Sequence, residues 1–199
     1  MAGVPQRALP WVSIASKYVN MTDLNSLREA PGPKGHEADR DMWRTASAQQ
    51  RVAMVELLFF AYRDFTGEAD EILGELKFGR AHHRVLHFVN RNPGLRVADL
   101  LGILKITKQS LARVLKQLVD EGHVRQTAGP VDRRERRLHT TDKGRALADT
   151  LLKLQTRRLG EVLDTIGPEA AAAAEAFLFG VISPDERGKV ETIVRRNTD

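Results

Sequence analysis

Apolar residues between about 41 and 66 recur at helical spacing and form two adjacent stripes. The first stripe consists of Val52, Val55, Phe59 and Tyr62, and the second of Met54, Leu58 and Phe65. A helix that is apolar over so broad a face needs partners on two sides. One partner is the rest of its own domain, and a second copy of the chain is the economical candidate for the other.

The next apolar positions predict three shorter helices. Residues 79–90 form the first, and Asn92-Pro93-Gly94 closes it. The second and third each place four apolar residues at i, i+3, i+4 and i+7; Thr107 can cap the third, which Gly122 ends. Their apolar sets are Val97, Leu100, Leu101 and Leu104, and Leu111, Val114, Leu115 and Leu118.

The period of the apolar pattern changes after the third short helix. An extended pattern interrupted by turn residues predicts a small hairpin, and beyond it the helical period returns. The expected elements are strands at 124–127 and 136–140 around a turn at 128–132, a helix from Thr141 to the Gly167-Pro168 break, and helical segments at 169–182 and 184–195.

Two short helices joined by a few residues and followed by a basic hairpin predict a winged helix-turn-helix. We therefore expect a mainly α fold, in which a winged helix-turn-helix domain with a small β-hairpin wing is flanked by N- and C-terminal dimerisation helices. The expected parts are an N-terminal extension with a Pro/Gly linker (1–40), an N-terminal dimerisation helix region (41–78), the winged domain (79–140) and the C-terminal dimerisation helices (141–199).

Composition excludes several classes of protein. The 199 residues are 42% hydrophobic and 29% charged, which is ordinary for a globular protein of one domain with appended helices. The chain has no cysteine, so disulfides, thiol nucleophiles and Cys-ligated metals are excluded. Because the chain has neither a long apolar run nor a signal sequence, we expect a cytoplasmic protein that does not contact a membrane.

Positive charge is concentrated in one part of the chain. Residues 105–145 hold 11 basic and 5 acidic residues, whereas the rest of the chain is nearly balanced. A local basic zone is typical of a protein that binds a polyanion, and nucleic acid is the commonest one. On charge alone, a solvated surface with no partner is the alternative.

The third short helix has the pattern of a helix that enters the major groove. Packing its apolar set inward places Gln109, Arg113 and Lys116 on the opposite face. Gln109 can bond adenine and Arg113 guanine, whereas Thr107 and Ser110 suit phosphate oxygens at the helix start. The residues expected to contact DNA from this helix are Thr107, Lys108, Gln109, Ser110, Arg113 and Lys116.

The hairpin tip carries arginines that can enter the neighbouring minor groove, where narrow A·T-rich segments attract them. The DNA-binding residues predicted in this segment are Asp132, Arg133, Arg134 and Arg136, with Arg137 beside them. An aspartate gains nothing by facing phosphate. Asp132 therefore either orients Arg134 or pairs the chain across the base of the wing.

Four segments together resemble the MarR family of bacterial transcription regulators: 106–111, 118–124, Asp132-Arg133-Arg134 and 141–144. The resemblance covers about residues 42–165. It implies an obligate homodimer on a pseudo-palindromic operator of double-stranded DNA, with DNA contacts from Asp132 and Arg134. Two positions depart from the family pattern: Lys105 stands where the turn usually has glycine, and Thr140 where leucine is usual. The N-terminal extension is also longer than the family needs.

The resemblance also implies a small-molecule effector, often aromatic, that binds between the dimerisation helices and the winged domain. Phe59, Tyr62, His83 and His87 are the candidate residues for that pocket, with plain core packing as the alternative for the two aromatics. Two histidines at i, i+4 could also bind a metal, but no further ligand completes a metal motif. We expect neither a metal nor another cofactor.

No arrangement of residues in the sequence supports catalysis, and we expect no enzyme. The sequence favours a sequence-specific DNA-binding regulator, a repressor, whose DNA binding is modulated by the effector. The alternative is a winged-helix module for non-specific nucleic-acid binding or for protein interaction.

Overall fold

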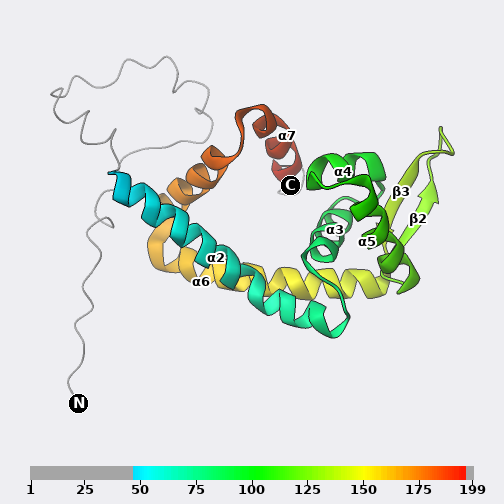
Figure 1. Ribbon diagram of the computed structural model, residues 1–199, viewed down its shortest axis with the longest axis horizontal. Helices are drawn as coiled ribbons and strands as arrows, with labels where there is room; N and C mark the ends of the chain where they lie inside the picture. The colour runs from blue at the N-terminus through cyan, green and yellow to red at the C-terminus, as the bar shows by residue number, and fades with distance from the viewer. Residues whose placement is uncertain (1–46, 196–199) are drawn as a thin grey trace. The chain divides into compact units, whose positions relative to one another are not determined.

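The computed structural model describes residues 47–195, which fall into two compact units, 47–159 and 160–195. The expectations for the N-terminal extension lie outside the described residues. Each unit is a separate body, and the first contains the winged domain (Figure 1).

The first helix, α2 (Ala48–Glu75), begins at Ser47, whose hydroxyl accepts a hydrogen bond from the backbone N–H of Gln50. The helix continues beyond the apolar stripes, which reach about residue 66, to Glu75. Inside the helix, the Thr66 hydroxyl donates to the carbonyl of Tyr62 at 3.0 Å, one turn earlier. Beyond it, Ala69 and Leu73 are buried, so the last turns of α2 are held by packing against the domain.

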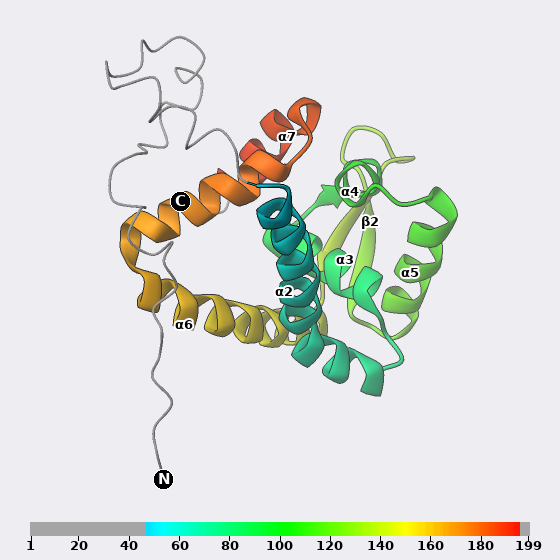
Figure 2. The ribbon, with the colours of Figure 1, turned by 60° about the vertical axis from the view of Figure 1, so that its left-hand side comes forward.

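Three short helices form the centre of the winged domain: α3 (Arg80–Arg91), α4 (Val97–Leu104) and α5 (Lys108–Asp120). Helix α3 contacts both α2 and α5 and lies between them (Figure 2). The bounds agree with the sequence prediction to within a residue or two. The fully buried side chains that join these helices are Leu73, Val85, Leu86, Val89, Leu100, Leu111 and Leu118.

The sheet has three antiparallel strands, β1 (Leu95–Arg96), β2 (Val124–Ala128) and β3 (Arg136–Thr140), in the order β1-β3-β2. The hairpin of β2 and β3 is the predicted wing, and it projects beyond α5 (Figure 1). The short strand β1 was not expected. Leu138 of β3 is fully buried, whereas Thr140 donates its hydroxyl to the side-chain oxygen of Asn90 on α3.

Helix α6 (Asp142–Val181) begins in the first unit, where the Thr141 hydroxyl accepts a hydrogen bond from the backbone N–H of Gly144. Gly144 is buried against the carbonyl of His123, at the end of the turn after α5. In the second unit, Gly167 adopts a φ of 79°, which interrupts the helix at the predicted break. Helix α7 (Pro184–Arg195) follows, and within residues 47–195 every helix falls short of what crossing a membrane requires.

The contact at Gly144 predicts opposite effects of the same substitution at two positions of α6. A Cβ at Gly144 would lie 1.9 Å from the His123 carbonyl oxygen, so Gly144→Ala should lower the free energy of unfolding by about 2 kcal/mol or more. A Cβ at Gly160 meets nothing within 4 Å, so Gly160→Ala should raise it by up to about 1 kcal/mol. Urea unfolding of both variants measures these changes. Equal changes in the free energy of unfolding would contradict the close approach of Gly144 to the His123 carbonyl.

Candidate nucleic-acid interface

Helix α5 has one buried face and one exposed face, as its apolar spacing predicts. Leu111, Leu115 and Leu118 are buried, whereas Gln109 and Arg113 are exposed. The Thr107 hydroxyl caps the helix by accepting the backbone N–H of Ser110 at 3.1 Å. The first turn therefore presents N–H groups and polar side chains to solvent, the arrangement that suits an anionic partner.

The turn between α4 and α5 keeps a left-handed residue although no glycine is present. Lys105 adopts φ 52° and ψ 41°, a conformation that costs a residue with a side chain about 1 kcal/mol. The carbonyl just before it, that of Leu104, accepts a hydrogen bond from the Arg84 guanidinium on α3 at 3.1 Å. The residue that departs from the family pattern thus adopts a left-handed conformation, which glycine takes at the least cost.

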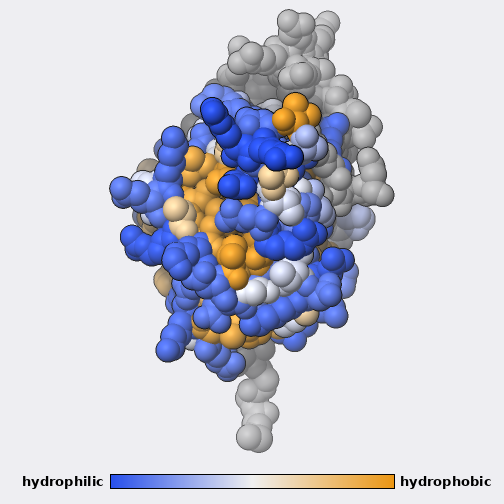
Figure 3. Space-filling view, turned by 90° about the vertical axis from the view of Figure 1, so that its right-hand side faces the viewer, coloured by the Kyte–Doolittle hydropathy of each residue, from blue (hydrophilic) through white to orange (hydrophobic). Residues whose placement is uncertain are grey.

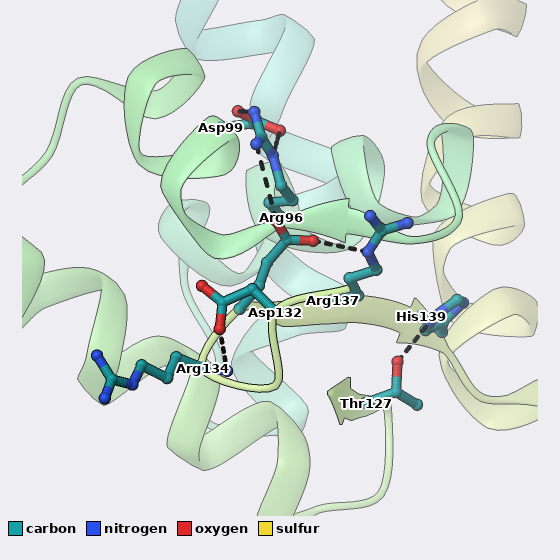
Figure 4. A network of polar contacts seen from close by, with 8 residues as sticks. Arg96, Asp99, Thr127, Asp132, Arg134, Arg137 and His139 are labelled. Carbon is teal, nitrogen blue, oxygen red and sulfur yellow. Dashed lines mark hydrogen bonds and ion pairs between the residues drawn. The ribbon is translucent and has the colours of Figure 1, made fainter. Parts of the chain in front are cut away.

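The wing tip is held by local hydrogen bonds. A carboxylate oxygen of Asp132 accepts the backbone N–H of Arg134 at 2.8 Å, while the Arg134 side chain extends away from the hairpin (Figure 4). Gly129 donates its N–H to the Glu135 carbonyl, and a Cβ at Gly129 would lie 2.7 Å from the Asp132 carbonyl oxygen. Asp132 therefore bonds the backbone of Arg134 within the wing tip, and its role toward DNA stays a prediction.

Some basic side chains near the wing are paired with carboxylates. Glu135 accepts from Arg137 at 2.7 Å and lies 3.8 Å from Arg96, which also binds both oxygens of Asp99 (Figure 4). On α5, Lys116 pairs with Asp120. Within residues 47–195, no such ion pair engages the exposed side chains of Arg113, Arg133, Arg134 or Arg136.

An open groove of about 1200 Å³ runs between α5 and the wing. Figure 3 shows apolar side chains exposed within a border of hydrophilic ones on this side of the molecule. We call the groove between α5 and the wing the wing groove. Its apolar lining is Val97, Leu101, Leu111, Ala112, Leu115, Val119 and Val124, and its basic lining is Arg96, Lys108, Lys116, Arg125, Arg134 and Arg136.

Two basic residues of the wing groove were missed from the sequence. Arg125 follows the buried Val124 in β2, so strict alternation along the strand would have placed it on the exposed face. Arg96 belongs to β1, which was not predicted, and its position therefore had no signal in the sequence.

The comparisons with known proteins agree with this geometry. A family model described as MarR family matches residues 77–135. The HTH-type transcriptional regulator PetP of Rhodobacter capsulatus is 45% identical over 133 residues, which are 67% of this chain and 80% of PetP. The chain belongs to the MarR family. It is a DNA-binding transcription regulator of the helix-turn-helix type, and this family is not enzymatic.

Solved structures share the fold of this MarR-family chain. FabT of Streptococcus pneumoniae, in complex with DNA, gives a TM-score of 0.58 at 18% identity, covering 67% of this chain and 94% of FabT. A mutant MarR of E. coli, complexed with operator DNA, gives 0.54 at 21% identity, covering 70% of this chain and 100% of that one. At these identities the likeness shows the fold alone.

The four effector candidates of this MarR-family chain lie in different environments. Phe59 and Tyr62 of α2 are 69% and 50% exposed, and the Arg80 guanidinium lies 5.1 Å from the centre of the Tyr62 ring. On α3, His83 is buried and His87 is partly buried. In the part of the chain that the structure describes, no group of three potential ligands could hold a metal ion.

Burial sets the charge of the two histidines. It lowers the pKa of His83 below the ordinary 6.5, although nearby Asp70 acts in the opposite direction. Burial also lowers the pKa of His87, and the neighbouring His83 and Arg91 lower it further. Both shifts favour the neutral imidazole.

The lowered pKa of His83 predicts that acid destabilises the fold. Below about pH 6.5 the unfolded chain binds a proton at His83 that the folded chain does not, so the free energy of unfolding falls as the pH drops, until the folded pKa is passed. Urea unfolding measures this at about pH 8 and about pH 5.5. Between the two, the free energy of unfolding should fall less for His83→Leu than for the wild type. An equal fall in the two proteins would mean that His83 does not contribute to the acid destabilisation.

Proposed function

We propose that this chain is a sequence-specific repressor that binds a pseudo-palindromic operator as a homodimer, and that a small-molecule effector modulates the binding. The observation that carries the proposal is the wing groove. It places basic side chains on both sides of an apolar floor, next to the exposed face of α5. Repression then follows from occupancy, because a protein covering an operator blocks other proteins from that site.

The geometry supports a definite path for the duplex. With α5 in the major groove and the wing tip in the adjacent minor groove, the sugar-phosphate strand that separates the grooves lies along the wing groove. The apolar floor faces deoxyribose, while Lys108, Arg125 and Arg136 face phosphates. Gln109 and Arg113 are left to contact base edges, and Arg134 to enter the minor groove.

The paired arginines have a different role in this proposal. Arg137 pairs with Glu135, and Arg96 pairs with Asp99 and Glu135, so two carboxylates already balance the two charges. These pairs join β1 to the wing and hold its angle to the domain. Of the wing-tip arginines, Arg133, Arg134 and Arg136 are then those that supply net charge to DNA.

The dimer is supported by apolar surface on α2. Large apolar side chains are exposed along its first half, more than a soluble monomer normally leaves in contact with water. These residues are Val52, Met54, Val55, Leu57, Leu58, Phe59, Phe60 and Tyr62. A second copy that covers them through a two-fold axis would present two copies of α5, and two related half-sites make a pseudo-palindrome.

Effector control is supported by the chemistry of α2 and α3. Phe59 and Tyr62 lie at the C-terminal end of the surface that a second copy would cover. With His83 and His87, whose neutral forms burial favours, they make a set that suits a flat aromatic ligand at the edge of that surface. Such a ligand changes DNA affinity only if it binds one dimer conformation more tightly than the other. We infer that it favours a spacing of the two α5 helices that does not match the operator.

We expect Arg134 and Arg113 to affect DNA binding differently. Arg134→Ala should weaken binding to every duplex and flatten its salt dependence, because fewer counterions are released. Arg113→Ala should cost about 1–3 kcal/mol on the duplex that the wild type selects from random-sequence DNA, and little on a scrambled duplex. Fluorescence anisotropy over a salt series measures both.

Lys153→Ala is the matched control, because it removes an exposed positive charge on α6, outside the wing groove, and should leave the salt slope unchanged. Equal slopes for wild type and Arg134→Ala would refute the role of the wing tip. Selection of DNA without a shared motif would instead favour the non-specific module.

The dimer proposal predicts that one charge on α2 dissociates the protein. Phe59→Asp places an unpaired carboxylate in the surface that the second copy covers, so sedimentation at micromolar concentration should shift from dimer toward monomer. Val131→Asp is the control, because this wing residue is 97% exposed and far from α2 in the sequence. A wild-type monomer would contradict both the dimer and the symmetric operator.

A further inference from the structure

The last turn of α5 is fastened to the start of α6. The Thr141 hydroxyl donates to the Gly122 carbonyl at 2.6 Å, and the Lys143 ammonium donates to the Glu121 carbonyl at 2.8 Å. Both acceptors belong to the residues that end α5. These two hydrogen bonds hold only the C-terminal end of α5. Its rotation and tilt against α3 depend on contacts elsewhere along the helix.

A second fastening comes from the connection between α2 and α3, through Gln117 of α5. The Gln117 amide nitrogen donates to the Lys77 carbonyl at 3.3 Å, and its amide oxygen lies 2.9 Å from Nε2 of His82. The two partners are 40 and 35 residues away in sequence. One side chain therefore joins α5 both to the connection after α2 and to the first turn of α3.

The hydrogen bonds of His82 define its tautomer. Nδ1 accepts the backbone N–H of Gly79 at 3.1 Å, so the ring proton of the neutral imidazole is on Nε2 and is donated to Gln117. The ring is also fixed in orientation, because it stacks on Phe78 with centroids 4.8 Å apart and planes 7° from parallel. Phe78 is itself buried, and its edge contact with the His123 ring reaches the turn after α5.

From these contacts we propose that His82 is a positioning residue for DNA recognition: through Gln117 it sets the orientation of α5 relative to α3. Gln117 stands one helical turn after Arg113, so a change in its position moves the side chains that would contact base edges. The inference rests on the proposed role of α5 in contacting bases. It adds that a residue of α3, outside the recognition helix and the wing, determines specificity.

The test compares two conservative substitutions that each keep half of the imidazole chemistry. His82→Gln keeps a donor at the Nε2 position, and His82→Asn keeps an acceptor at the Nδ1 position but loses the bond to Gln117. Anisotropy measures binding to the duplex that the wild type selects and to a scrambled duplex of the same length. His82→Asn and His82→Ala should weaken selected-site binding about five- to tenfold, with His82→Gln close to wild type.

Binding to the scrambled duplex and its salt slope should not change, because no phosphate contact is lost. Gln117→Ala should match His82→Ala, and the double variant should lose no more than either single one. Asp149→Ala is the control: it removes a bond from α3 to α6, through Asn90, without touching α5. Circular dichroism establishes that each variant is folded.

The results separate this inference from the proposed function. If Arg113→Ala fails to lower selected-site binding, the role of α5 is wrong. If Arg113→Ala does lower it but His82→Asn and His82→Gln bind equally, or Asp149→Ala has the same effect as His82→Ala, the positioning role of His82 is wrong.

Discussion

The structure depends on the amphipathic packing of α5: the helix buries one face completely and keeps the opposite face exposed. Leu111, Leu115 and Leu118 are held by the domain, so the helix cannot rotate without exposing them to water. This fixes the direction of Gln109 and Arg113 without using any polar group of their own. The strand pairing of the wing and the caps of α5 preserve that direction.

Carboxylates near the interface separate the basic residues into a paired and an exposed group. Glu135, Asp99 and Asp120 each pair with a basic neighbour, whereas the wing-tip arginines are exposed and form no such ion pair within the described residues. Exposed ion pairs of this kind contribute little to stability, generally below about 1 kcal/mol. Their larger effect is on geometry and on which positive charges a phosphate meets.

The local features were predictable from the sequence, because each has a short-range signal. The i, i+4 spacing of leucines marked α4 and α5, Thr107 marked a helix start, and Gly122 marked its end. Strand β1 was missed because two residues carry no periodicity. The bonds of Gln117 to Lys77 and His82 had no local signal, since they join residues 35 or more positions apart.

The fastening of α5 at its C-terminal end makes the helix a lever. Its 13 residues rise by about 1.5 Å each, so its N-terminal end lies about 20 Å from the C-terminal one. A rotation of about 5° at the C-terminal end would move the other by about 1.7 Å, enough to break a base hydrogen bond. Because Leu111 near the N-terminal end is buried, such a movement also disturbs the core, so base contacts and core packing are lost together.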